Sequence, residues 1–80
     1  MTRQDVLRVI EENLDLDRGS LTGREALRDV PGWDSMSTLM FVAAIDEQFG
    51  RPLAGSRVAA CRTVADLLGL LGLNAMDRAA

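Results

Sequence analysis

The chain has 80 residues, which is enough for one small domain and leaves no room for a second core. Hydrophobic residues make up 48% of it, and twelve acids against nine arginines give a net charge of −3, with no lysine or histidine. This composition indicates a folded acidic domain and argues against nucleic-acid binding, because no basic stripe is present. Since histidine is absent, a Ser-His or Cys-His catalytic pair within the chain is excluded.

A first helix is predicted directly after the N-terminus. Thr2 and Asp5 have the spacing of a capping box, and the residues behind them repeat with helical period. The apolar residues on one face are Val6, Leu7, Ile10 and Leu14. The charged residues expected on the opposite face are Arg3, Arg8, Glu11 and Glu12. This pattern predicts an amphipathic helix of about 13 residues.

A long connection is predicted over residues 16–34, where glycines and prolines interrupt any regular pattern. Connections of this length in small domains are usually functional or held down by their own side chains. We expect Leu21, Leu27 and Val30 to anchor this one against the core. Residues 25–28 are predicted to form a single helical turn.

The second helix is predicted to start at Asp34-Ser35 and to run to Phe49, where Gly50 and then Pro52 end it. Its core stripe is expected to contain Phe41, Val42, Ile45 and Phe49. Further apolar residues fall on its other faces, namely Met36, Leu39, Met40 and Ala43. A helix in so small a domain cannot be buried on all sides, so part of this surface should be exposed for a functional reason. Met40 fits either an interface or the core.

The C-terminal part is predicted to contain one short and one longer helix. Ser56 is expected to cap a short turn that runs to Cys61, and the spacing of Thr63 and Asp66 predicts a second capping box. The last helix should turn Val64, Leu67, Leu68 and Leu71 inward and stop near Gly72, with residues 74–80 frayed. No segment alternates with the period of a strand. We therefore predict an all-α four-helix bundle, a single domain over residues 1–80 with its ordered core at about residues 2–72.

The residues around Ser35 combine features that a phosphate-linked group needs. Asp34 or Ser35 at a helix start is what helix capping favours, and capping alone is a sufficient explanation for either residue. Pro31 and Gly32, however, lead the chain tightly into the helix, so Ser35 should lie at an exposed corner. The free N–H groups and positive dipole end of a helix N-terminus suit a phosphate. The expected apolar surface starts immediately after Ser35, which indicates a site for an arm linked through a phosphate.

The stretch 32–36, Gly-Trp-Asp-Ser-Met, resembles the Asp-Ser-Leu signature of the acyl carrier protein family. The resemblance covers nearly the whole chain, including the helix end at residues 46–50 and the helix start at residues 63–67. It implies that Ser35 carries 4′-phosphopantetheine derived from coenzyme A, and that the thiol of this arm holds an acyl cargo as a thioester. It also implies a carrier without catalytic residues or metal. Asp34 either helps the attaching enzyme or only caps the helix.

The resemblance implies three kinds of partner: a phosphopantetheinyl transferase, an acyl- or aminoacyl-loading enzyme, and a downstream synthase or transferase. Acids are common along the second helix of related fatty-acid carriers, whereas this chain has Ser37, Met40 and Gln48 at such positions. We therefore expect recognition to depend mainly on an apolar surface. The expected recognition residues are Met36, Leu39, Met40 and Ala43, with Glu47 beside them. This pattern favours a specialised, stand-alone carrier of polyketide or other secondary-metabolite biosynthesis over a housekeeping fatty-acid carrier.

Other interpretations remain open at this point. The step from Ser35 to Met36, with methionine in place of leucine, resembles that of D-alanyl carrier proteins and keeps an amino-acid cargo possible. The Gly-Gly pair that usually precedes the serine region of peptidyl carriers is missing. A small helical interaction domain would use Ser35 only as a cap, and a helix-turn-helix DNA reader is disfavoured by the acidic charge. Cys61 has no disulfide or metal-ligand partners and is expected to fill space at the core. Without a signal core or an apolar run of membrane-spanning length, we expect a cytoplasmic monomer that binds neither membrane nor nucleic acid.

Overall fold

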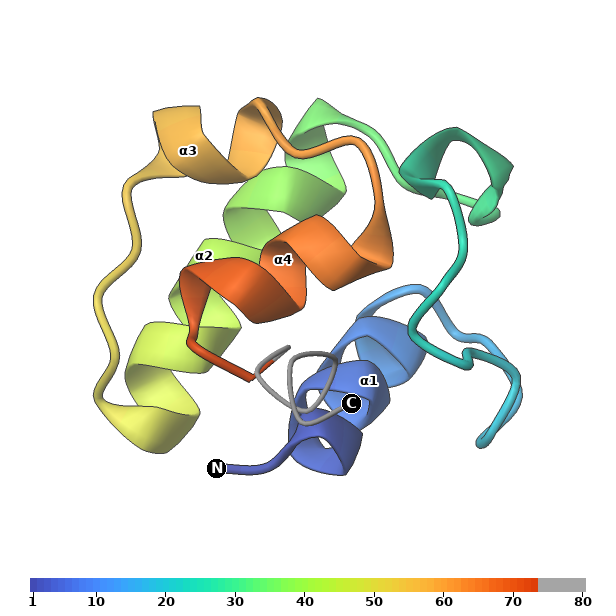
Figure 1. Cartoon of the computed structure of the whole chain (residues 1–80), viewed down its shortest axis with the longest axis horizontal. Coiled ribbons are helices and arrows are strands. Elements are labelled where there is room, and N and C mark those ends of the chain that lie inside the picture. Colours follow the sequence, from blue (N-terminus) through green and yellow to red (C-terminus); the bar gives the residue numbers. More distant parts are fainter. Residues whose placement is uncertain (74–80) are drawn as a thin grey trace, which may run out of the picture.

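Helices account for all the regular secondary structure in residues 1–73, the part of the chain that the computed structural model describes (Figure 1). The elements are α1 (Arg3–Asn13), the 3-10 helix η1 (Leu27–Asp29), α2 (Ser35–Phe49), α3 (Gly55–Ala59) and α4 (Val64–Leu70). The predicted all-α bundle with one short helix and a long first connection is confirmed. The tail that was expected to fray, residues 74–80, lies outside the described residues.

The first and last helices begin where their capping boxes predicted. Thr2 Oγ1 accepts a hydrogen bond from the N–H of Asp5 at 3.1 Å, and Asp5 Oδ2 accepts one from the N–H of Thr2 at 2.8 Å. Thr63 and Asp66 make the same reciprocal pair at the start of α4. Each box satisfies N–H groups that the first turn of a helix leaves free, which fixes the start of the helix locally.

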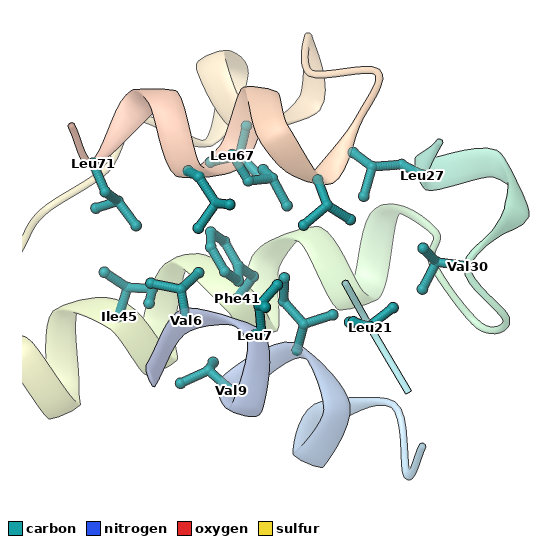
Figure 2. Packing of buried hydrophobic residues seen from close by; sticks show 14 residues of the cluster. Val6, Leu7, Val9, Leu21, Leu27, Val30, Phe41, Ile45, Leu67 and Leu71 are labelled. Atoms are coloured by element: carbon teal, nitrogen blue, oxygen red, sulfur yellow. The ribbon is translucent and has the colours of Figure 1, made fainter. Parts of the chain in front are cut away.

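The core lies between α1, α2 and α4, with Phe41 of α2 at its centre (Figure 2). Phe41 and Ile45 are almost completely buried, at 1% and 0% exposure, as the predicted stripe required. Two further members of that stripe, Val42 and Phe49, are only half-buried. Phe49 is the last residue of α2 and lies at the edge of the bundle. The predicted inward residues of α4 are confirmed, namely Val64, Leu67, Leu68 and Leu71. On α1, Val9 is buried although it was not predicted, and Leu14 is half-buried.

Glu11 lies inside the fold rather than on the polar face of α1, so the prediction for this residue was wrong. Its side chain is only 4% exposed, and Oε2 accepts hydrogen bonds from the N–H groups of Gly19 (3.1 Å) and Leu21 (3.0 Å). A buried carboxylate needs such donors, because an unpaired buried charge is costly. The first connection folds back over the end of α1 and supplies them. Glu11 therefore holds the start of this connection against the helix.

Replacing Glu11 with alanine should lower the free energy of unfolding by about 1–3 kcal/mol, because two N–H groups lose their acceptor in a partly buried place. Glu12 is the matched control, since it is the next residue along the helix and is exposed. Alanine at Glu12 should change the stability by no more than about 0.5 kcal/mol. Urea unfolding of the two variants measures the difference, and equal losses would contradict the role given to Glu11.

The long first connection is anchored by the residues predicted for that role. Leu21, Leu27 and Val30 are all buried. The helical turn, however, comes two residues later than predicted, as η1. Glu25 cannot join it, because its carboxylate accepts hydrogen bonds from the N–H groups of Thr22 and Gly23, and its carbonyl accepts one from Val64. Ala26 then forms an isolated bridge with Thr63, which keeps this stretch extended.

The short helix α3 starts at Gly55 and has Ala54 at its N-cap position, so the predicted capping role of Ser56 was wrong. Cys61 follows α3 and is half-buried, as expected for a small filler. Burial raises the pKa of its thiol, and the nearby negative charge of Asp66 raises it further. Within residues 1–73 no helix is both long and apolar enough to cross a membrane, and no group of three or more potential metal ligands occurs.

Candidate functional site

The start of α2 is fixed by Asp34, which is its N-cap residue. Asp34 Oδ1 accepts a hydrogen bond from the N–H of Ser37 at 2.9 Å, and Ser37 Oγ accepts one from the N–H of Asp34 at 2.7 Å. The bond from the Ser37 N–H is the main cause that holds the pKa of the Asp34 carboxyl below its ordinary value. Asp34 therefore stays ionised at neutral pH and caps the helix, which was one of the two roles left open for it.

Ser37 and Thr38 belong to the same hydrogen-bond network, and sequence reasoning did not identify them. Ser37 is 4% exposed, and its hydroxyl oxygen lies 3.0 Å from the carbonyl oxygen of Asp34 and 3.2 Å from that of Gly32. Thr38 Oγ1 donates to the carbonyl of Asp34 at 2.9 Å. Ser37 therefore does not face outward in the place of a recognition acid. The spacing of Asp34 and Ser37 is that of a capping box and was a signal for this contact.

Ser35 is the first residue of α2 and is exposed. Because Asp34 and Ser37 make the cap, the hydroxyl of Ser35 is not needed for it. Ser35 lines a pocket of about 290 Å³ between α2 and α3, together with Thr38, Leu39, Ser56 and other residues of α3. The prediction of an exposed corner at Ser35 is confirmed, and this corner opens onto a mostly apolar hollow.

The predicted recognition residues form an exposed surface along α2, which we call the apolar patch: Met36, Leu39, Met40 and Ala43. The exposed fractions of its three large side chains are 65% for Met36, 61% for Leu39 and 41% for Met40. Ala43 is exposed as well, and so is Glu47 one turn further along the helix. Met40 therefore faces solvent rather than the core. A helix that presents several large apolar side chains to water is typical of a binding surface.

These surroundings fit a phosphate-linked arm on Ser35. An exposed hydroxyl is available for a phosphodiester bond, and the phosphate would lie at the positive end of a helix of 15 residues. The adjoining pocket offers apolar walls to the methylene groups of such an arm. The carboxylate of the neighbouring Asp34 accepts a hydrogen bond from the N–H of Ser37.

Comparison with known proteins identifies the family of the chain. Residues 4–71 match the family model for the phosphopantetheine attachment site. Neither the curated proteins nor the solved structures gave a significant match. The matched range runs from α1 to the end of α4 and includes the whole start of α2. The chain therefore belongs to the phosphopantetheine-attachment family of acyl-carrier-like domains, and its covalent cofactor is 4′-phosphopantetheine.

Proposed function

We propose that the phosphopantetheine arm is attached to Ser35 Oγ, and that the chain carries an acyl cargo on this arm as a thioester. The observation that carries this proposal is the exposure of Ser35 at the first position of α2, outside the hydrogen bonds of the cap. When bound, the arm supplies the thiol that holds the cargo. The chain itself contributes the attachment oxygen, a helix end suited to phosphate and a surface that partner enzymes can recognise.

Intact mass spectrometry after incubation with coenzyme A and a phosphopantetheinyl transferase tests the attachment. One adduct is expected per chain. Trypsin cleaves after Arg28 and Arg57 but not at the Arg51-Pro52 bond, so the adduct should be found on the peptide of residues 29–57, which contains three serines, Ser35, Ser37 and Ser56. Fragmentation of this peptide then distinguishes between them. A chain that gains no adduct would be an interaction domain rather than a carrier.

We place the carrier in a dedicated pathway of polyketide or other secondary-metabolite biosynthesis rather than in general fatty-acid synthesis. The apolar patch supports this assignment, because Met40 stands where an acid is common in related fatty-acid carriers, and Met36 and Leu39 beside it are exposed apolar side chains. Flexible methionine side chains suit a surface that must adapt to several enzymes. The Ser35-Met36 step keeps an aminoacyl cargo of the D-alanyl or peptidyl type as the alternative.

Recognition through the apolar patch predicts a specific response to substitution. Met40→Glu should lower kcat/KM for arm attachment by the transferase about fivefold or more, because central apolar contacts commonly contribute over 1 kcal/mol to an interface. Glu47→Lys should have a smaller effect. Raising the salt concentration should weaken the reaction only modestly, since screening acts on exposed charges and not on apolar burial.

Gln48→Glu is the matched control, because it adds the same charge as Met40→Glu on the same helix without removing apolar surface from the patch. Its kinetics should resemble those of the parent. If Glu47→Lys is the more damaging change and the reaction collapses with added salt, docking is electrostatic and the role given to the apolar patch is wrong.

A further inference from the structure

A second hollow has a volume of about 660 Å³ and is lined by Trp33, which lies two residues before the start of α2. We call it the cargo groove. One wall consists of η1 and the residue before it, and the opposite wall is the connection between α3 and α4. Both walls lie at the same end of the molecule as the start of α2 (Figure 1). Ala59 lines the cargo groove and also the smaller pocket that contains Ser35. The two hollows therefore adjoin at Ala59, and Ser35 lines the smaller one.

Two arginines give the cargo groove its charge, although the chain as a whole is acidic. Arg28 lines it from η1 and Arg62 lines it from the opposite wall. The side chains of Leu27, Trp33 and Ala59 add apolar surface. A guanidinium group offers a planar set of N–H donors that matches a carboxylate, and it pairs well with one beside apolar surface.

Two acids near these walls, Asp66 and Glu25, accept hydrogen bonds from backbone groups. Asp66 Oδ2 accepts hydrogen bonds from the N–H groups of Arg62 (3.0 Å) and Thr63 (3.2 Å). Glu25 accepts hydrogen bonds from N–H groups of the first connection. Asp29 follows Arg28 in η1 and is exposed. Arg28 and Arg62 therefore supply the positive charge of a hollow that is otherwise largely apolar.

We propose that the cargo groove binds an acyl cargo that ends in a carboxylate, a half-thioester of a dicarboxylic acid, with Arg28 and Arg62 on the carboxylate and Trp33 beside the acyl chain. This inference rests on the proposed attachment of the arm to Ser35. A neutral acyl chain of similar length would meet the same apolar wall but would gain no charge interaction with either arginine. Charge therefore selects the class of cargo that stays in the groove.

The experiment compares two cargoes of similar length that differ in charge. The transferase loads the chain from succinyl-coenzyme A or from butyryl-coenzyme A, and intact mass confirms each thioester. Two readouts follow: the amide ¹H–¹⁵N shifts of the whole domain, and the fluorescence of Trp33, which is the only tryptophan in the chain. The rate at which hydroxylamine cleaves each thioester, relative to the same coenzyme A thioester free in solution, measures protection of the cargo.

Succinyl cargo should shift the amides of residues 26–28 and 59–63 and change the fluorescence of Trp33, whereas butyryl cargo should do so weakly. Cleavage of the succinyl thioester should be slowed about two- to fivefold more than that of the butyryl thioester, which is the range expected for exposed charge pairs. The double variant Arg28→Gln, Arg62→Gln should abolish the difference. Arg57→Gln is the matched control, because Arg57 is an exposed arginine of α3 outside the groove, and it should keep the difference.

Equal shifts and equal protection for the two cargoes would overturn the proposal, and so would shifts confined to the pocket of Ser35, Leu39 and Ser56. If no adduct forms, the proposed function fails separately, and the groove is then tested with free S-succinyl- and S-butyryl-pantetheine by the same amide shifts. Preferential binding of the succinyl compound at residues 26–28 and 59–63 would still support the groove, and its absence would overturn it.

Discussion

Ser35→Ala is expected to abolish attachment of the phosphopantetheine arm completely and to leave the domain folded. The variant removes the only atom proposed to form the bond to the phosphate. The hydrogen bonds of the α2 cap join Asp34 and Ser37, so removing the hydroxyl of Ser35 breaks none of them. The free energy of unfolding should change by no more than about 0.5 kcal/mol, as for other exposed substitutions away from special features. Intact mass and thermal unfolding measure the two effects on the same sample.

Ser56→Ala is the control for this experiment, because Ser56 is an exposed serine that lines the same pocket as Ser35. It should accept the arm at the rate of the parent. An adduct that persists in Ser35→Ala, on Ser37 or on Ser56, would refute the assignment. Ser37 is a poor substitute, since its hydroxyl is buried in the cap and attachment there would require the first turn of α2 to open.

Phe41→Ala should destabilise the domain by about 3–5 kcal/mol, which is a large share of the roughly 5–15 kcal/mol that holds small domains folded. Phe41 is 1% exposed and lies at the centre of the core between α1 and α4 (Figure 2). Its ring also meets that of Trp33 edge-on, at a centroid distance of 6.1 Å and an angle of 67°. The variant should therefore lower the unfolding midpoint in urea and change the fluorescence of Trp33 in the folded state.

Two other substitutions in α2 serve as controls for the loss of stability expected in Phe41→Ala. Leu39→Ala removes an exposed side chain and should leave the urea midpoint nearly unchanged. Phe49→Ala removes a half-buried ring at the end of the helix and should cost clearly less than Phe41→Ala. If Phe41→Ala unfolds at the urea concentration of the parent, the core described for α2 is wrong.

The features that could be predicted from the sequence are those fixed by neighbouring residues. The capping boxes of Thr2 and Thr63 join groups three positions apart, and Gly50 ends α2 in the left-handed conformation that favours glycine. Glu11 was assigned wrongly, because its donors come from a connection that returns to α1 only in the folded chain. Its position one turn after Leu7 and close to Leu14 was the signal that it lay near the apolar face.

In the candidate site, too, some features depend on neighbouring residues and others on tertiary packing. Periodicity and the small size of the domain predicted an exposed apolar face on α2 with Met36, Leu39 and Ala43, whereas Met40 fitted either an interface or the core until the structure showed it exposed. The pocket beside Ser35 and the cargo groove had no comparable signal. The pocket has walls from α2 and α3, and the cargo groove joins the first connection to the segment between α3 and α4, so each combines residues that are not neighbours in the sequence. Only the tertiary packing of these elements brings Arg28 and Arg62 into one hollow.

The isolated bridge between Ala26 and Thr63 makes the cargo groove preorganised. The N–H of Leu27 donates to the carbonyl of Arg62 at 2.9 Å, and the N–H of Val64 donates to the carbonyl of Glu25 at 2.9 Å. These two bonds tie together the backbone segments that carry the two arginines, so their separation is set before any cargo arrives. Ordering of loops on binding costs affinity, and a backbone that is already fixed leaves only side chains and the arm itself to lose conformational entropy. Widening the groove between these two segments would require both backbone hydrogen bonds to break, so a bulky cargo gains no room there without a loss of stability.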